Sequence, residues 1–185
     1  MKTKLLRRII TMLLFLFIAN PVLLIAQNGI ESVNDNGFRI FNFGDSVEQY
    51  GADVCVWFPV EDIIRYKYCG NDTSVYKMDD IRFDNVVLCF DQENRLCSVS
   101  YSLYKSQSTK LKEFKKQQDA IYRKISDYLI SLYGKDYEND TNVECLSQKW
   151  TANNVIVSLK KFGGGNNYWC RFDVKFQKDF QQTDE

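Results

Sequence analysis

The chain has 185 residues, 24 basic and 24 acidic side chains, and no histidine. Its length suits one domain with its own hydrophobic core. Without histidine it cannot build a Ser-His-Asp or Cys-His catalytic centre. Its balanced charge disfavours nucleic acid and anionic membranes as partners, because both attract a basic surface.

Residues 1–26 have the layout of a secretory signal peptide. Four basic residues precede an apolar run, which Asn20-Pro21 interrupts and which ends at the small residue Ala26. This pattern is typical of a cleaved signal, so we expect export to the periplasm or the medium and no membrane contact afterwards. An uncleaved anchor is the alternative, because the run is close to the shortest membrane span. Cleavage leaves 20 basic and 24 acidic residues, a mildly acidic domain.

The exported part begins with residues 27–37, which are polar and turn-rich and predict a flexible lead-in. One domain is expected over residues 38–178, followed by a polar tail, residues 179–185. Within the domain, residues 38–43 are aromatic, and we expect them to be extended.

A short helix is predicted next. Either Asp45 with Glu48 or Ser46 with Gln49 fits a capping box, and Gly51 interrupts the helix soon afterwards. Ser46 and its two neighbours also match a short acceptor pattern for bacterial periplasmic O-glycosylation. Ser46 is therefore a candidate helix cap or modification site.

The segment between residues 54 and 78 gives mixed signals. Residues 54–58 look like a strand, and Pro59 then offers the start of a helical turn over residues 60–66. Residues 73–78 alternate between polar and apolar side chains and predict another strand.

A β-hairpin is predicted after this segment. Residues 86–90 and 96–103 flank the turn residues 91–95, a pattern typical of two antiparallel strands. Alternation in the second strand predicts an apolar face and a polar face. The apolar face would hold Cys97, Val99, Tyr101 and Leu103, and the polar face Ser98, Ser100 and Ser102.

Residues 109–133 predict one long amphipathic helix, because apolar residues recur there at spacings of three and four. This stripe consists of Leu111, Phe114, Ile121, Ile125, Tyr128, Leu129 and Leu132. Gly134 follows directly, as expected at the C-terminal end of a helix.

Three further strands follow the helix. Residues 146–150 and 155–159 flank a turn, and a glycine-rich loop at residues 163–167 leads to the last strand. Alternation divides that strand into two faces. One face would hold Tyr168, Cys170, Phe172, Val174 and Phe176, and the other Trp169, Arg171, Asp173 and Lys175.

The order of elements predicts an α+β fold, a curved antiparallel sheet with the long helix on its inner face. Two copies of an αβββ unit are one interpretation of this order. The pattern runs from the helix start at residues 43–46 to the helix end at residues 132–135 and Trp150. It resembles small exported bacterial domains of the β-lactamase-inhibitor-protein-like and outer-membrane-assembly-lipoprotein-like folds. This resemblance implies a protein-binding scaffold rather than a catalyst.

Six cysteines in an exported domain predict disulfides. The lack of histidine and of C-x2-C spacing argues against a metal site. A bridge cannot cross a sheet, so strand parity suggests two pairs and leaves the third as the remainder. The predicted pairs are Cys89–Cys145, Cys97–Cys170 and Cys55–Cys69.

Three carboxylate pairs are candidates for catalysis of the glycosidase kind. These pairs are Glu61-Asp62, Asp79-Asp80 and Asp91 with Glu93. Adjacent acids on a strand point to opposite faces, and acids in a hairpin turn are ordinary turn residues. We therefore expect no enzyme, no cofactor and no metal.

Aromatic residues outside the predicted core suggest a binding face. Alternation turns Trp169 and Arg171 away from the core, and Trp57, Tyr66 and Tyr68 lie in the segment with mixed signals. Exposed aromatic rings beside basic residues suit protein or sugar contacts. A second layer of structure over these residues is the alternative.

The sequence therefore favours an exported, non-catalytic module that binds a protein, for example as an inhibitor or immunity protein. The alternatives are a carbohydrate-active or carbohydrate-binding protein and a structural component of the cell envelope. Two carboxyl groups about 5–10 Å apart in a cleft would favour the carbohydrate enzyme. An open sheet face that carries Trp169 would favour the binding module.

Overall fold

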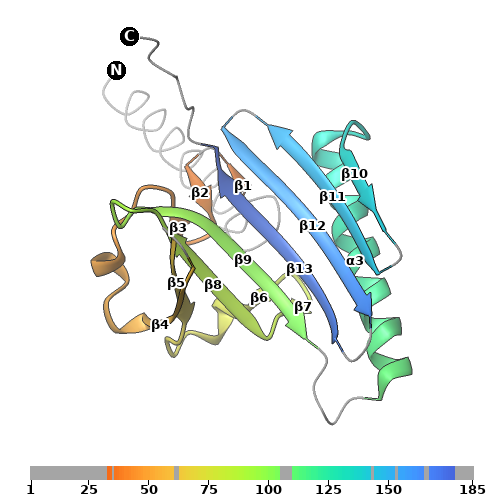
Figure 1. The fold of residues 1–185 in the computed structure, drawn as a ribbon, viewed down its shortest axis with the longest axis horizontal. Helices are drawn as coiled ribbons and strands as arrows, with labels where there is room; N and C mark the ends of the chain where they lie inside the picture. The colour runs from red at the N-terminus through yellow and green to blue at the C-terminus, as the bar shows by residue number, and fades with distance from the viewer. Residues whose placement is uncertain are drawn as a thin grey trace, which may run out of the picture.

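The computed structural model describes residues 33–34, 36–60, 63–104, 110–142, 144–152, 154–164 and 167–177. Its centre is an eight-stranded sheet in the order β10-β11-β12-β13-β9-β8-β5-β4, in which all neighbours are antiparallel (Figure 1). The strands are β4 (Val54–Val60), β5 (Ile63–Tyr68), β8 (Asn85–Phe90), β9 (Leu96–Tyr104), β10 (Glu138–Thr141), β11 (Cys145–Ala152), β12 (Val155–Gly164) and β13 (Asn167–Phe176). One long helix, α3 (Leu111–Tyr133), packs on this sheet, which confirms the α+β class.

The two halves of the sheet follow the same path. β4, β5, β8 and β9 run from one edge to the centre, and β10 to β13 do so from the other edge. The 3-10 helix η2 (Val47–Asp53) precedes the first four strands, and α3 precedes the second four. The unit in this topology therefore has four strands, one more than the expected αβββ unit. Its origin by duplication stays a prediction.

The helix α3 covers the C-terminal half of one face and lies behind the β10–β12 side of the sheet in Figure 1. Phe114, Ile125 and Leu129 from the predicted stripe are buried, whereas Leu111 and Leu132 near the helix ends are exposed. As expected, the helix ends at Tyr133 and is followed by Gly134, which has a φ of 83°. This left-handed conformation favours glycine because it has no Cβ.

N-terminal segments cover the other half of the same face. Phe38 places its ring edge-on to Tyr101 and Phe172, at centroid distances of 5.4 and 5.5 Å. Phe41 is fully buried beside it in the same cluster. This layer includes a small three-stranded sheet, β1 (Val33–Asn34), β2 (Gly37–Phe38) and β3 (Phe41–Asn42). One continuous hydrophobic core therefore lies along a single face of the large sheet.

Two predictions between residues 54 and 78 are wrong. The residues described within the expected helical turn over residues 60–66 are strand, not helix. Pro59 lies instead within the edge strand β4, where its missing N–H need not disrupt pairing, and β5 begins at Ile63. The strand expected over residues 73–78 starts as a 3-10 helix, η3 (Thr73–Tyr76). The Asp72 carboxylate caps η3 by accepting a hydrogen bond from the N–H of the residue two positions on, at 2.8 Å.

After η3 comes a short hairpin, β6 (Lys77–Met78) and β7 (Ile81–Arg82), before the predicted β8–β9 hairpin. The latter is confirmed, as is the alternation in β11, β12 and β13. In β13, Cys170, Phe172 and Val174 are buried in the core. Strict alternation therefore located both faces of the C-terminal half of the sheet.

The predicted Cys55–Cys69 disulfide is confirmed, with 6.1 Å between the Cα atoms. The other two predicted bridges are wrong, because the remaining cysteines are free thiols: Cys89, Cys97, Cys145 and Cys170. Cys170 lies in the core, whereas Cys97 lines the opposite face of the sheet. Cys89 and Cys145 lie on strands that are separated by three others.

The predicted signal peptide, the polar tail and most of the lead-in lie outside the described residues. Within the described part of the chain, no helix is long and apolar enough to cross a membrane. The Cys55–Cys69 disulfide indicates an oxidising compartment, because such bonds are rare in the reducing cytosol.

Candidate binding groove

The face of the sheet opposite α3 carries a groove of about 430 Å³, within the range of about 300–1,000 Å³ typical of ligand sites. Part of its lining comes from Ser98, Ser100 and Ser102, alternate residues of β9. Their short side chains leave room between longer neighbours. The other lining residues are Trp57, Ile63, Arg65, Val87, Cys89, Cys97, Tyr104, Ile156, Ser158, Lys160, Arg171, Asp173 and Lys175.

A buried carboxylate, Asp173, lies within the groove and is 8% exposed. It accepts hydrogen bonds from Ser100 Oγ, from Ser158 Oγ at 3.4 Å and from Arg171 Nε at 2.8 Å. These donors supply the pairing that a buried charge needs. Because its oxygens are already engaged, Asp173 is better suited to holding the groove in shape than to acid–base catalysis.

Basic side chains outnumber acidic ones among the residues that line the groove. Among the described residues that line it, Asp173 is the one carboxylate, and the cations are Arg65, Lys160, Arg171 and Lys175. The low-dielectric walls of a cleft concentrate the field of such charges. The described lining of the groove is therefore positive, although basic and acidic residues balance over the whole chain.

Aromatic rings accompany these cations. Trp57 and Tyr104 line the groove and are 41% and 40% exposed. Tyr104 pairs with Trp169 on the neighbouring strand, and the Trp169 ring stacks on Phe162 with centroids 5.4 Å apart. The Arg171 guanidinium lies 5.9 Å from the Trp169 centroid, within the range of a cation–π contact. Tryptophan, tyrosine and arginine are the residues that most often anchor protein interfaces.

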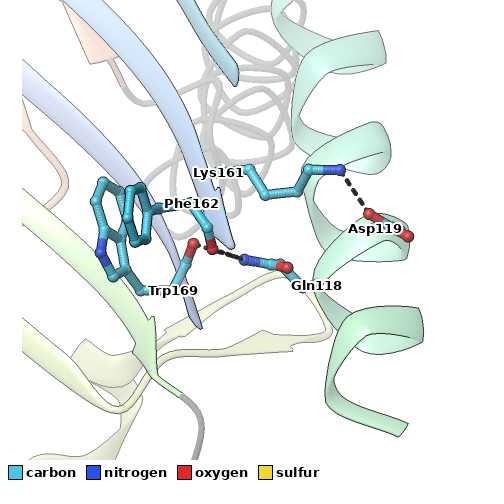
Figure 2. A network of polar contacts seen from close by, with 5 residues as sticks. All are labelled: Gln118, Asp119, Lys161, Phe162 and Trp169. Carbon is cyan, nitrogen blue, oxygen red and sulfur yellow. Dashed lines mark hydrogen bonds and ion pairs between the residues drawn. The ribbon is translucent and has the colours of Figure 1, made fainter. Parts of the chain in front are cut away.

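A side chain of α3 fixes the backbone of this stacked pair. Gln118 points from the helix to the sheet, where its Nε2 donates to the carbonyl oxygens of Phe162 at 2.8 Å and Trp169 at 2.7 Å (Figure 2). Beside it, Lys161 Nζ contacts Asp119 Oδ1 at 2.6 Å. Sequence reasoning missed Gln118, although its position within the apolar stripe of the helix was an available signal.

Only some of the residues predicted for the binding face lie together on one side of the sheet. Trp169 and Arg171 lie on the open face, as alternation predicted. Tyr66 and Tyr68 do not. Tyr68 is buried, and Tyr66 packs against the core with a ring 5.3 Å from another aromatic centroid. The reason is that this segment is a strand, β5. Its alternation turns Arg65 to the groove and Tyr66 to the core.

Of the predicted carboxylate pairs, the two that the structure describes do not line the groove. Asp80 forms an ion pair with a lysine of α3. Asp91 accepts hydrogen bonds from two backbone N–H groups of its own turn, at 2.9 and 3.0 Å. Glu61-Asp62 lies outside the described residues. Across the described ranges, no group of three or more potential ligands could hold a metal ion.

Two free thiols, Cys89 and Cys97, line the groove. Burial raises the pKa of Cys89 and raises that of Cys97 to about 11. Both are therefore protonated near neutral pH. Since the thiolate is the reactive form, neither is suited to act as a catalytic nucleophile.

Ser46 occupies the N-cap position of η2, and its backbone N–H donates to Gln49 Oε1 at 3.1 Å. Of the two predicted capping boxes, this contact belongs to the one formed by Ser46 and Gln49. Glycosylation of the hydroxyl stays a prediction.

Comparisons of the chain with models of protein families, with curated proteins and with solved structures find no match. The function is therefore argued from the groove, and the resemblance in pattern to exported inhibitor-like domains stays a prediction.

Proposed function

We propose that this chain is an exported, non-catalytic module that binds an acidic segment of a protein partner in the groove. The observation that carries the proposal is the composition of the open sheet face. Four cations and two exposed aromatic residues surround a hollow lined by serines, and one carboxylate there is already paired. A partner with alternating acidic and apolar side chains would match both kinds of lining residue.

The charge of the groove supports an acidic partner over a neutral one. Asp173 forms an ion pair with Arg171. Lys160 and Lys175 also line the groove, and the part of the lining that the structure describes holds no second carboxylate for them. Complementary charge raises the rate of encounter and sets specificity. Binding should therefore weaken as salt rises, because salt screens exposed charges.

The runner-up function, carbohydrate binding, draws support from Trp57 and Tyr104, because flat exposed rings also suit sugars. A glycosidase, however, needs two carboxyl groups, and among the described lining residues Asp173 stands alone. Carbohydrate binding is therefore an outcome of the experiment below. No observation specifically favours a structural role in the cell envelope.

The test measures the binding of a short dye-labelled peptide in which glutamate alternates with valine, with fluorescence anisotropy as the readout. The same peptide with glutamine replacing glutamate is the control ligand. We expect the acidic peptide to bind the wild-type chain and to lose binding at least tenfold to the double variant Lys160→Glu, Lys175→Glu. A matched control, Lys112→Glu with Lys116→Glu, makes the same charge change on exposed positions of α3 and should bind as the wild type does.

Equal binding of the acidic and glutamine peptides would overturn the proposal, as would equal loss in both double variants. A neutral oligosaccharide that binds the wild type, and whose binding is lost in Trp57→Ala but kept in Lys160→Glu, Lys175→Glu, would replace it with the carbohydrate function.

A further inference from the structure

The hairpin of β8 and β9 contains a β-bulge at its cysteines. Cys89 pairs with Ser98 and Phe90 pairs with Leu96, so that Cys97 is an extra residue without a register partner. At a bulge, two residues of one strand lie opposite a single residue of the other. Cys97 and Ser98 therefore both lie opposite Cys89.

The bulge also changes which face Cys97 occupies. Regular alternation from Val99 would turn it to the core, which is what the sequence predicted. It lines the groove instead, as Cys89 does. The Cys97 thiol is directed at its neighbour, because Sγ donates to the Cys89 carbonyl oxygen at 3.3 Å. Opposed residues in antiparallel strands have Cα atoms about 4.5–5.5 Å apart, within the range of about 4.4–6.8 Å that a disulfide requires.

We propose that Cys89 and Cys97 form a second disulfide across this bulge, in the compartment that oxidises Cys55 and Cys69. The oxidant is an external disulfide, such as that of a thiol oxidoreductase. One thiol loses its proton and attacks the external disulfide, forming a mixed disulfide and releasing one thiol. The second cysteine, also deprotonated, then attacks the protein sulfur of the mixed disulfide, which forms the Cys89–Cys97 bond and releases the second thiol of the oxidant. Two electrons pass to the oxidant, whose disulfide becomes two thiols.

The other two free cysteines are not positioned to compete. Cys170 is fully buried in the core. Cys145 lies on β11, with three strands between it and β8. The reaction should be slow near neutral pH, because burial raises the pKa of both Cys89 and Cys97 and leaves little thiolate.

The experiment incubates the purified full chain with oxidised glutathione and counts the remaining thiols by alkylation in denaturant and intact mass. The free thiols should fall from four to two. Trypsin cleaves after Arg95, between the two cysteines, so a non-reduced digest should contain the Cys89 and Cys97 peptides as one linked species.

Two variants separate this pair from any other. Cys89→Ser should retain three thiols after oxidation, whereas Cys145→Ser should retain one and still give the linked species. Four remaining thiols in the wild type, or a bridge from Cys97 to Cys145 or Cys170, would overturn the proposal.

Discussion

Neighbouring residues of β13 belong to two different faces of the sheet. Phe172 and Val174 are fully buried in the core, whereas Arg171 and Asp173 form an ion pair on the open face. The covered face is filled by aromatic and aliphatic side chains, and the open face by serines, cations and partly exposed rings. Since these roles alternate along one strand, stability and recognition can be altered separately at adjacent positions.

The largest expected effect on the free energy of unfolding is at Trp150, and its neighbour on β11, Thr151, is the matched control. Trp150 is 1% exposed, and its Nε1 donates to the Gly134 carbonyl at 3.2 Å, whereas the next residue, Thr151, is exposed. Trp150→Ala should lower the free energy of unfolding by about 3–5 kcal/mol, because it leaves a cavity. Thr151→Ala should change it by about 0.5 kcal/mol or less. Urea unfolding measures both, and equal losses would contradict the division into two faces.

The C-terminal half of the sheet could be predicted from sequence because its strands alternate without interruption. Trp169, Arg171, Asp173 and Lys175 were placed on one face, and all of them lie away from the core. The bonds that organise this face could not be predicted. Ser100 and Asp173 are 73 residues apart, and their contact depends on the pairing of β9 with β13.

The N-terminal half was less predictable because local signals there have two structural meanings. A proline can begin a helix or lie in an edge strand, and Pro59 does the latter. This ambiguity hid the alternation of β5, and with it the place of Arg65 in the groove. The bulge at Cys97 interrupts the alternation of β9 in the same way, since an inserted residue leaves no trace in composition.

The core of the covered face should also respond to alkaline pH. Burial raises the pKa of Tyr101 to about 12, above the value of about 10 for an exposed tyrosine. The stabilisation is fully present below about pH 10 and is lost as pH rises towards 12, because only the unfolded chain then ionises readily. This difference of two pKa units corresponds to about 3 kcal/mol in the free energy of unfolding.

The comparison that isolates this contribution is wild type against Tyr101→Phe. Thermal or urea unfolding between pH 8 and 12 should show a steeper loss of stability for the wild type. The variant removes the ionisable group together with a 3.3 Å hydrogen bond from Arg39 Nη1, so it starts slightly less stable at pH 8. Parallel curves for the two proteins would contradict the assignment.

A smaller effect on the free energy of unfolding is expected at Gln118, which lies on the covered side of the sheet and bonds to the backbone of two residues of the open face. Gln118→Ala removes both hydrogen bonds to the Phe162 and Trp169 carbonyls, and unsatisfied polar groups cost about 1–3 kcal/mol. The adjacent Gln117 is exposed, so Gln117→Ala should cost about 0.5 kcal/mol or less. Urea unfolding measures the difference, and near-ultraviolet circular dichroism should report altered packing of Trp169 in the first variant. Identical stabilities would show that Gln118 does not anchor the pair.

The smallest effect on stability, and the clearest separation of the two faces, is expected for Lys160→Gln and Lys175→Gln. Neither lysine belongs to the core, so each change should leave the free energy of unfolding within about 0.5 kcal/mol of the wild type. Each should nevertheless weaken binding of the glutamate–valine peptide about two- to fivefold at low salt, since exposed charge pairs contribute about 0.2–1 kcal/mol. Raising the salt concentration should reduce wild-type affinity towards that of the variants, because the lost interaction is the one that salt screens. A weaker affinity that persists unchanged at high salt would instead indicate that these lysines act through the shape of the groove.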